Sequence, residues 1–203
     1  VEELHGVESW IIPDRIEAAT YLVAAAMTRG DVKLTEVNSN HLASVIEKLE
    51  ESGCKIDYDD NSISLRMDNA PQPVDINTAV YPGFPTDVQA QWTVYMLLAS
   101  GTSRITDNIY FDRFKHVPEL HRLGADIDVV ENTALVRGGS KLTGATVMSS
   151  DLRASASLIL AALVARGTTD VLRIYHIDRG YESIERKLLS LGASIRRVKT
   201  EQF

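Results

Sequence analysis

The chain repeats one plan of helix boundaries three times, and this internal repeat constrains its fold more than any other feature of the sequence. In each copy an aspartate precedes an apolar stretch that ends in glycine, and a second helical stretch ends in another glycine. The equivalent glycines are Gly30, Gly101 and Gly167 after the first stretch, and Gly53, Gly124 and Gly192 after the second, about 66 to 71 residues apart. Such self-similarity at a nearly fixed period indicates an architecture built from repeated units.

Each unit is predicted to contain a strand, a helix, a second strand, a second helix and a third strand, and the first two units have a further strand. Residues 59–61 and 131–133 have the composition of hairpin turns between the last two strands. The aspartates stand where helix N-caps occur, and the glycines where C-caps occur. The predicted strands are 32–37, 103–108 and 169–174 after the first helices, and 55–58, 126–130 and 194–198 after the second.

The two kinds of helix predict the architecture. The first helix of each unit is apolar nearly all round, over residues 18–27, 92–99 and 158–165, as expected for a helix buried on every side. The second helix is amphipathic, with Leu42, Val45, Ile46 and Leu49 on one face in the first unit. We therefore predict an α/β fold in which residues 1–203 form one domain. Three pseudo-symmetric units, at about 1–70, 71–138 and 139–203, would surround three buried central helices.

Composition excludes several function classes. The 21 basic and 28 acidic residues give a net charge of −7, which argues against broad binding to nucleic acid or to an anionic membrane. An anionic ligand must therefore be held by a local basic cluster.

The single cysteine, Cys54, allows no internal disulfide and favours a reducing cytoplasm. No apolar run reaches the ~18 residues of a membrane span, and no signal peptide opens the chain. The first residue is Val1 and not Met, from which we expect a fragment of a longer protein.

The sequence also lacks the usual cofactor motifs. It has neither a glycine-rich dinucleotide-binding fingerprint nor a phosphate-binding P-loop. His116 and His121 are five residues apart, which does not place them on a shared helical face with metal-ligand spacing. No metal site is therefore predicted.

Aligning the units superposes charged residues that we expect at helix N-termini on one end of the molecule. They are Asp14, Asp87 and Asp151 before the first helices, Arg15 and Arg153 close after them, and the pairs Asp112-Arg113 and Asp178-Arg179 before the second helices. Helix N-termini stabilise anions by ~0.3–1 kcal/mol, and the arginine fork fits carboxylate and phosphate. Two interpretations stay open at this point: an anion-binding face, or ordinary N-caps with local Asp–Arg pairs.

Four strings in the same chain carry a specific resemblance. Residues 81–91 read YPGFPTDVQAQ, 112–120 DRFKHVPEL, 151–155 DLRAS and 175–182 YHIDRGYE. In this order they resemble the signatures of the UDP-N-acetylglucosamine enolpyruvyl transferases, over essentially the whole chain and more loosely before residue 75. The resemblance implies two domains, each an inside-out α/β barrel, that close on the substrates between them. It also implies transfer of enolpyruvyl from phosphoenolpyruvate to the sugar 3-hydroxyl, in peptidoglycan precursor synthesis, with no metal or organic cofactor.

The resemblance further implies roles for individual residues. Asp87 matches the residue that contacts the sugar 3-hydroxyl and is the proposed base. Arg179 matches the arginine that binds phosphoenolpyruvate, and Ile109 matches a position whose backbone contacts the UDP-sugar. The remaining matches are Arg113, Asp151 and Arg153, which line the cleft, and Asp14-Arg15, which follow the connection between the domains.

Three features of the family have no counterpart in this sequence. The family's other domain supplies a mobile loop with a cysteine general acid and a lysine that binds phosphoenolpyruvate, and a short N-terminal strand returns to complete the domain described here. We therefore expect this chain to be half of an enzyme, inactive without its partner domain. Two alternatives remain: a 3-phosphoshikimate enolpyruvyl transferase, and a non-catalytic domain that binds a nucleotide-sugar or another anion.

Overall fold

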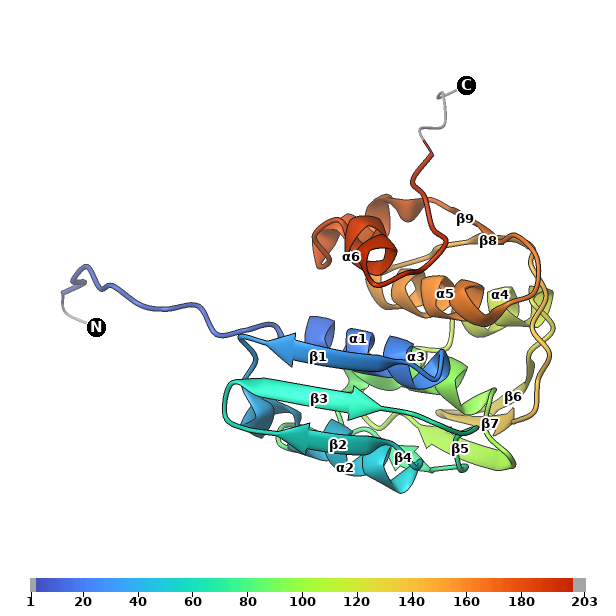
Figure 1. Ribbon diagram of the computed structural model, residues 1–203, viewed down its shortest axis with the longest axis horizontal. Helices are drawn as coiled ribbons and strands as arrows, with labels where there is room; N and C mark the ends of the chain where they lie inside the picture. The colour runs from blue at the N-terminus through green and yellow to red at the C-terminus, as the bar shows by residue number, and fades with distance from the viewer. Residues whose placement is uncertain (1–2, 199–203) are drawn as a thin grey trace.

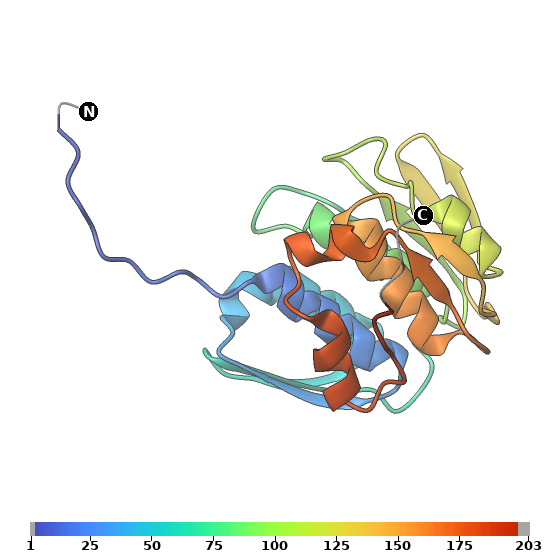
Figure 2. The ribbon, with the colours of Figure 1, turned by 90° about the horizontal axis from the view of Figure 1, so that it is seen from above.

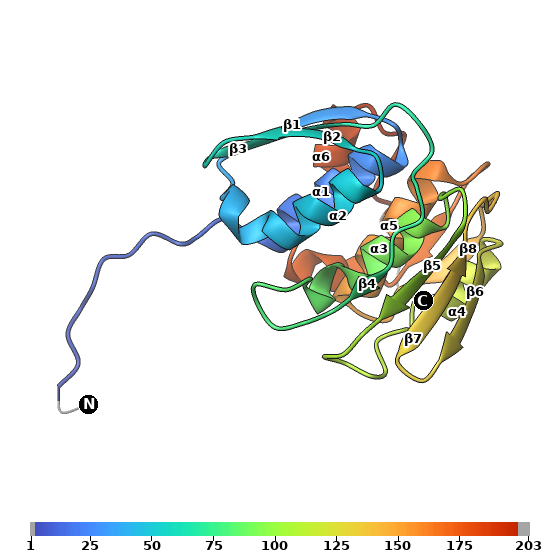
Figure 3. The same ribbon diagram turned by 90° about the horizontal axis from the view of Figure 1, so that it is seen from below.

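Three separate β-sheets lie on the outside of three central helices (Figure 1; Figure 3). The structure is a computed structural model that describes residues 3–198. Within these residues no strand pairing joins one sheet to another. Residues 3–14 extend away from this body without forming a helix or a strand (Figure 2).

The central helices are α1 (Arg15–Met27), α3 (Gln89–Met96) and α5 (Leu152–Val164), each at a position predicted from its apolar stretch. All eight residues of α3 are buried. Each of the three helices contacts both of the others. The prediction of three buried helices at the centre is confirmed. The physical reason is that a helix without a polar face removes its apolar surface from water only when other apolar surface covers it on all sides.

The second helices are α2 (Ala43–Glu51), α4 (Val117–Arg122) and α6 (Ile184–Ser190), with their apolar faces turned inward. Gly53, Gly124 and Gly192 follow them with positive φ angles of 103°, 91° and 96°, as predicted for C-cap glycines. The prediction is wrong for Gly30 and Gly101, which do not have positive φ. After α1 the left-handed position belongs to Arg29, at φ 52°.

The sheets follow the repeat with two departures. The first sheet has the order β1-β3-β2, the second β4-β5-β7-β6, and the third contains β8 and β9. Their strands are β1 (Asp31–Thr35), β2 (Lys55–Tyr58), β3 (Ser62–Arg66), β4 (Ile76–Asn77), β5 (Thr102–Thr106), β6 (Asp126–Val130), β7 (Thr133–Arg137), β8 (Thr146–Met148) and β9 (Asp170–Leu172). The β4–β5 and β8–β9 pairs are parallel, and both hairpins, β2–β3 and β6–β7, are antiparallel.

The departures concern the two ends of the repeat. The predicted strand 194–198 is wrong, because none of these residues pairs with a strand of the described part of the chain. Residues 3–14, which precede α1, also form no leading strand of the kind that β4 and β8 provide in the other units. A β-strand is stabilised by neighbouring strands and not by its own sequence alone. A segment with the residue pattern of a strand can therefore remain without strand structure.

The three aspartates of the repeat do not behave alike. Asp14 accepts hydrogen bonds from the backbone N–H groups of Ile16 and Glu17, and so caps α1 as predicted. Asp151 caps α5 in the same way. Asp87 does not cap a helix, so that prediction is wrong. It lies inside a 3-10 turn, η2 (Thr86–Val88), and no side chain caps α3.

The cap of α1 can be tested by substitution. We expect Asp14→Ala to lower the free energy of unfolding by about 1 kcal/mol, because two backbone donors at the start of a buried helix lose their acceptor. Asp60→Ala is the matched control, since Asp60 is exposed and its side chain makes no hydrogen bond within residues 3–198. Urea unfolding of both variants measures the difference, and equal stabilities would contradict the capping role.

Candidate functional site

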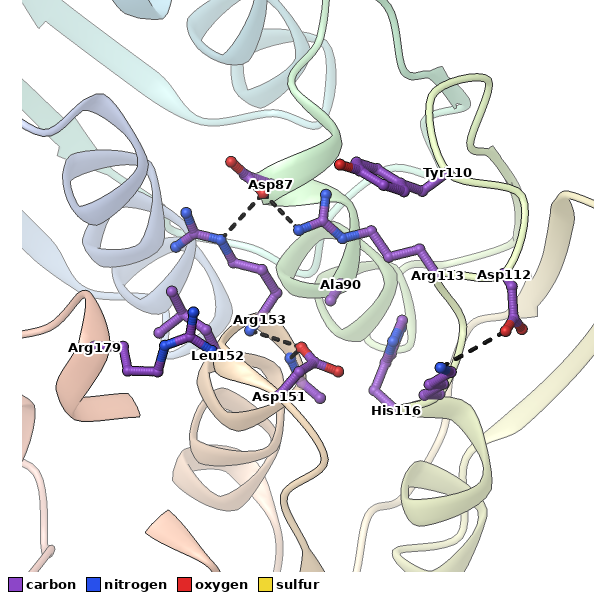
Figure 4. Close-up of a pocket in the computed structure, with 12 residues that line it drawn as sticks. Asp87, Ala90, Tyr110, Asp112, Arg113, His116, Asp151, Leu152, Arg153 and Arg179 are labelled. Carbon is purple, nitrogen blue, oxygen red and sulfur yellow. Dashed lines mark hydrogen bonds and ion pairs between the residues drawn. The ribbon is translucent and has the colours of Figure 1, made fainter. Parts of the chain in front are cut away.

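A pocket of about 520 Å³ lies where the N-terminal ends of α3 and α5 meet the loop before α4 and the turn η3 (Ile174–Arg179) (Figure 4). Its wall combines four cationic side chains with three carboxylates. The lining residues are Asp87, Ala90, Tyr110, Asp112, Arg113, Lys115, His116, Asp151, Leu152, Arg153, Ala154 and Arg179. The excess of cations gives this net-acidic chain a local basic cluster of the kind predicted from its charge.

Asp87 is the electrostatic centre of the pocket, because two arginines converge on one of its oxygens (Figure 4). Arg113 Nη2 donates to Asp87 Oδ1 at 2.6 Å, and Arg153 Nε lies 3.3 Å from the same atom. Burial raises the pKa of Asp87, but the two guanidinium groups more than offset that effect and hold the pKa below its usual range. The carboxylate is therefore ionised at neutral pH.

A buried carboxylate fixes the loop that carries Arg113. Asp107 is fully buried at the end of β5, where it accepts hydrogen bonds from the hydroxyls of Thr78 and Thr86, both at 2.7 Å. It also accepts from the backbone N–H groups of Ile109 and Tyr110, both at 3.0 Å. Thr86 in turn accepts from Arg113 Nη1 at 2.8 Å. Asp107 thus orders both the loop backbone and the guanidinium that reaches Asp87.

The opposite wall contains Asp151 and His116. Burial raises the pKa of Asp151, and hydrogen bonds from the backbone of Ala154 and Arg153 and from the Ser150 hydroxyl outweigh it, so the net pKa is lowered. His116 is almost fully buried, and its Nε2 atom has no hydrogen-bond partner within residues 3–198. Burial lowers the pKa of His116 to about 4, although the Asp151 charge opposes the shift. The imidazole is therefore neutral at neutral pH.

The structure brings together five of the residues predicted from sequence: Asp87, Arg113, Asp151, Arg153 and Arg179. Arg179 points into the pocket beside Leu152 (Figure 4), and none of its nitrogens forms an ion pair within residues 3–198. Two predicted residues do not line the pocket. Arg15 lies with its guanidinium 5.0 Å from the centre of the Tyr81 ring, and Ile109 lies in the loop after β5, partly exposed.

One prediction of position is also corrected. Asp112-Arg113 and Asp178-Arg179 are not at the N-termini of the second helices, because α4 begins at Val117 and α6 at Ile184. The first pair lies in a loop and the second at the end of η3. Arg113 and Arg179 are therefore placed at the pocket by a loop and by a 3-10 turn, and not by the first turn of an α-helix.

Several residues of the site were not singled out from the sequence. Tyr110 places its ring 5.1 Å from the Arg113 guanidinium carbon, and Lys115 pairs with Asp112 at 3.7 Å. His116 was considered only as a metal ligand, yet it stands in the DRFKHVPEL string that carries the resemblance. Asp107 had no motif of its own, because it fell inside the predicted strand 103–108, whereas the structure ends β5 at Thr106 and places Asp107 directly after it.

The arrangement combines groups that can hold an anion with a group that can accept a proton. Arginine forks and a neutral imidazole can hold phosphate or carboxylate groups, and an ionised carboxylate can accept a proton. Among residues 3–198 no group of three His, Cys, Asp or Glu side chains is placed to hold a metal ion. No helix in the same residues is both long and apolar enough to cross a membrane.

Fold and site together describe an α/β chain with a pocket lined by arginines and aspartates at the ends of buried helices. The chain belongs to the EPSP synthase (3-phosphoshikimate 1-carboxyvinyltransferase) family, whose family model matches residues 1–188.

Relatives and solved structures agree with this assignment. The UDP-N-acetylglucosamine 1-carboxyvinyltransferase of Chlorobium chlorochromatii is 56% identical over 200 residues, which cover 98% of this chain and 47% of that protein. The enolpyruvyl transferase NikO of Streptomyces tendae has a TM-score of 0.84 at 28% identity, over 92% of this chain and 44% of its own. EPSP synthase of Acinetobacter baumannii shares the fold, with a TM-score of 0.70 at 16% identity over 94% and 44% of the two chains. The chain spans about half the length of the curated relatives it matches.

The buried imidazole makes a prediction about pH. The pKa of His116 is about 4 in the folded chain and about 6.5 when unfolded, so the unfolded state binds more protons between these values. Stability is therefore complete above about pH 6.5 and falls as the pH is lowered toward 4. We expect His116→Asn to flatten the decline in unfolding free energy between about pH 6.5 and about pH 4.5, a window above the range in which Asp87 and Asp151 titrate.

The control for this experiment is His5→Asn, which changes an exposed residue of the N-terminal segment and should keep the wild-type slope. Denaturant unfolding at several pH values measures all three proteins. An unchanged slope in His116→Asn would show that another group causes the decline.

Proposed function

We propose that this chain is one domain of a transferase that moves enolpyruvyl from phosphoenolpyruvate to the 3-hydroxyl of UDP-N-acetylglucosamine and releases phosphate. The observation that carries the proposal is Asp87, an ionised carboxylate held by Arg113 and Arg153 on a pocket that Arg179 also lines. The name of the relative that is 56% identical favours the sugar nucleotide as acceptor. The similarity to EPSP synthase, at 16% identity, supports the fold and not shikimate 3-phosphate as a substrate.

In this proposal Asp87 is the general base. It takes the proton of the sugar hydroxyl, whose oxygen then adds to C2 of phosphoenolpyruvate, while the electrons of the C2–C3 double bond take up a proton at C3 from the general acid of the second domain. Loss of a proton from C3 then restores the double bond, the bond between C2 and the phosphate oxygen breaks, and phosphate leaves with the bonding electrons. A positioned base of this kind contributes ~10²–10⁴ in rate. The lowered pKa of Asp87 ensures that it is deprotonated before the hydroxyl arrives.

The same ion pairs make Asp87 a weak base until the substrates bind. The phosphate and carboxylate of phosphoenolpyruvate compete with Asp87 for the two arginines, since each guanidinium prefers a bidentate anion. Loss of either ion pair raises the pKa of Asp87 toward its ordinary value. Binding of the anion therefore strengthens the base when the reaction is ready to proceed.

The other predicted residues have supporting roles in the proposal. Arg179 binds phosphoenolpyruvate, and Arg113, Arg153 and Asp151 line the closed cleft. Ile109 contacts the UDP-sugar through its backbone, which Asp107 holds in place. Arg15 lies at the connection between the domains.

We further infer the setting in which the domain acts. Residues 1–203 form one domain, an inside-out α/β barrel in the intact enzyme, and a second domain closes over the pocket with a cysteine loop and a lysine. Closure excludes water and completes the group of catalytic residues. The reaction belongs to peptidoglycan precursor synthesis in the cytoplasm and uses no metal or organic cofactor.

The experiment that tests the function is reconstitution. The purified chain is mixed with the remaining part of the Chlorobium chlorochromatii transferase, and phosphate release is measured with phosphoenolpyruvate and UDP-N-acetylglucosamine. We expect turnover from the mixture and none from either part. Asp87→Asn should reduce kcat by ~10²-fold or more, because Asn cannot accept the proton.

The outcomes separate the candidate functions. Turnover with shikimate 3-phosphate in place of the sugar nucleotide would establish the other transferase. Near-normal turnover of a folded Asp87→Asn mixture would remove Asp87 as the base, and substantial turnover by this chain alone would contradict the two-domain proposal.

A second prediction concerns Arg179. In the reconstituted enzyme, Arg179→Lys should weaken the apparent affinity for phosphoenolpyruvate by about 10-fold or more, because an ammonium group cannot make the bidentate contact of a guanidinium. Arg186→Lys is the matched control, since Arg186 is exposed on α6 and does not line the pocket. Equal phosphoenolpyruvate dependence in the two variants would exclude Arg179 as an anion clamp.

A further inference from the structure

We propose that Tyr181 is a positioning residue whose phenol oxygen holds the Arg153 guanidinium toward Asp87. Tyr181 lies between η3 and α6 and is only 2% exposed. Its oxygen is 2.8 Å from Thr20 Oγ1 on α1, 3.4 Å from Gln91 Nε2 on α3 and 3.4 Å from Arg153 Nη1 on α5. One hydroxyl therefore contacts a polar group of each central helix, at the place where the three helices meet.

The hydrogen bonds around Tyr181 determine which partner donates. The Thr20 hydroxyl donates its one proton to the backbone oxygen of Ile16 at 2.8 Å, so Thr20 can only accept from Tyr181. The phenol proton of Tyr181 therefore points toward Thr20. The lone pairs of the phenol oxygen remain to accept from Arg153 and Gln91, both of which can only donate through these nitrogens.

Arg153 is consequently held at two nitrogens. Nη1 donates to Tyr181 at 3.4 Å, and Nε faces Asp87 Oδ1 at 3.3 Å. Both distances are at the long end of the hydrogen-bond range, so neither contact alone fixes the planar group. Together they set its position and orientation, because a rigid guanidinium bound at two edges cannot rotate freely. Arg113 differs, since it reaches Asp87 from a loop and is anchored by Thr86.

The phenol must stay neutral to keep this polarity. Burial raises the pKa of Tyr181, and the opposing effects of Thr20 and Arg153 do not cancel it. The hydroxyl is therefore protonated throughout the neutral range, as donation to Thr20 requires.

A second tyrosine in the same apolar cluster provides a contrast. The hydroxyl of Tyr21 is buried and has no hydrogen-bond partner within residues 3–198. Tyr21 and Tyr181 thus share burial and residue type but not the link to Arg153. A phenylalanine substitution at each position removes one buried oxygen, and only the substitution at Tyr181 releases the arginine.

The role of Tyr181 in catalysis rests on the proposed function, but the positioning itself can be measured without any substrate. The pKa of the Asp87 carboxyl is determined by NMR titration in the 203-residue chain. Two charged groups pair with Asp87, Arg113 from the loop before α4 and Arg153 from α5. Tyr181→Phe leaves Arg113 untouched, so a changed pKa reports on Arg153.

We expect Tyr181→Phe to raise the pKa of Asp87 by at least about 0.5 unit, since a less ordered Arg153 stabilises the carboxylate less. Tyr21→Phe should leave the wild-type value. Thr20→Val keeps the side-chain shape and frees the Tyr181 proton to turn toward Arg153, so it should raise the pKa of Asp87 as well and provides the test if Tyr181→Phe does not fold.

An Asp87 pKa that is unchanged or lower in the folded variants would overturn the proposal, and so would an equal rise in Tyr21→Phe. Failure of the reconstituted enzyme to release phosphate would instead count against the proposed function alone.

Discussion

The structure depends on the mutual packing of α1, α3 and α5. Each of these helices is apolar nearly all round, so none can present a face to water without exposing hydrophobic surface. Packing the three helices against one another, with the sheets and the amphipathic helices outside, buries all of them. This packing brings the starts of α3 and α5 together. It is the reason that Asp87 and Arg153, from different units, form an ion pair with 3.3 Å between Asp87 Oδ1 and Arg153 Nε.

The candidate site lies where the three equivalent aspartates of the repeat differ in their contacts. Asp14 and Asp151 each accept hydrogen bonds from two backbone N–H groups through one carboxylate oxygen, and so cap the helix that follows. In the second unit the 3-10 turn η2 precedes α3, and Asp87 is released from capping. Its carboxylate then accepts from arginines instead. A carboxylate that pairs only with side chains can exchange those partners for a substrate, whereas a capping carboxylate would uncap its helix if it did.

The sequence predicted the parts of this structure that depend on local pattern. Helix positions followed from apolar stretches, and the left-handed glycines after α2, α4 and α6 followed from the repeat. The motif strings identified five residues of the pocket. Contacts between units could not be predicted, because the ion pairs of Asp87 depend on how α3, α5 and the loop before α4 are placed in space. The unformed strand at 194–198 failed for a related reason, since a strand requires a partner that its own pattern does not specify.

The core beside the site contains polar atoms that a purely structural core would avoid. Oε1 of Gln89, Oε1 of Gln91 and Nε2 of His116 are buried without hydrogen-bond partners within residues 3–198, and each such atom costs about 1–3 kcal/mol. The apolar packing of the three helices offsets this cost, because it removes a large hydrophobic surface from water. The amide nitrogen of Gln91 contacts both Thr20 and Tyr181, so replacing it with an apolar side chain would remove one donor from the network that holds Arg153. The stability lost at these positions is therefore tied to the geometry of the site, since Gln89 and Gln91 begin the helix that follows Asp87 and His116 lines the pocket.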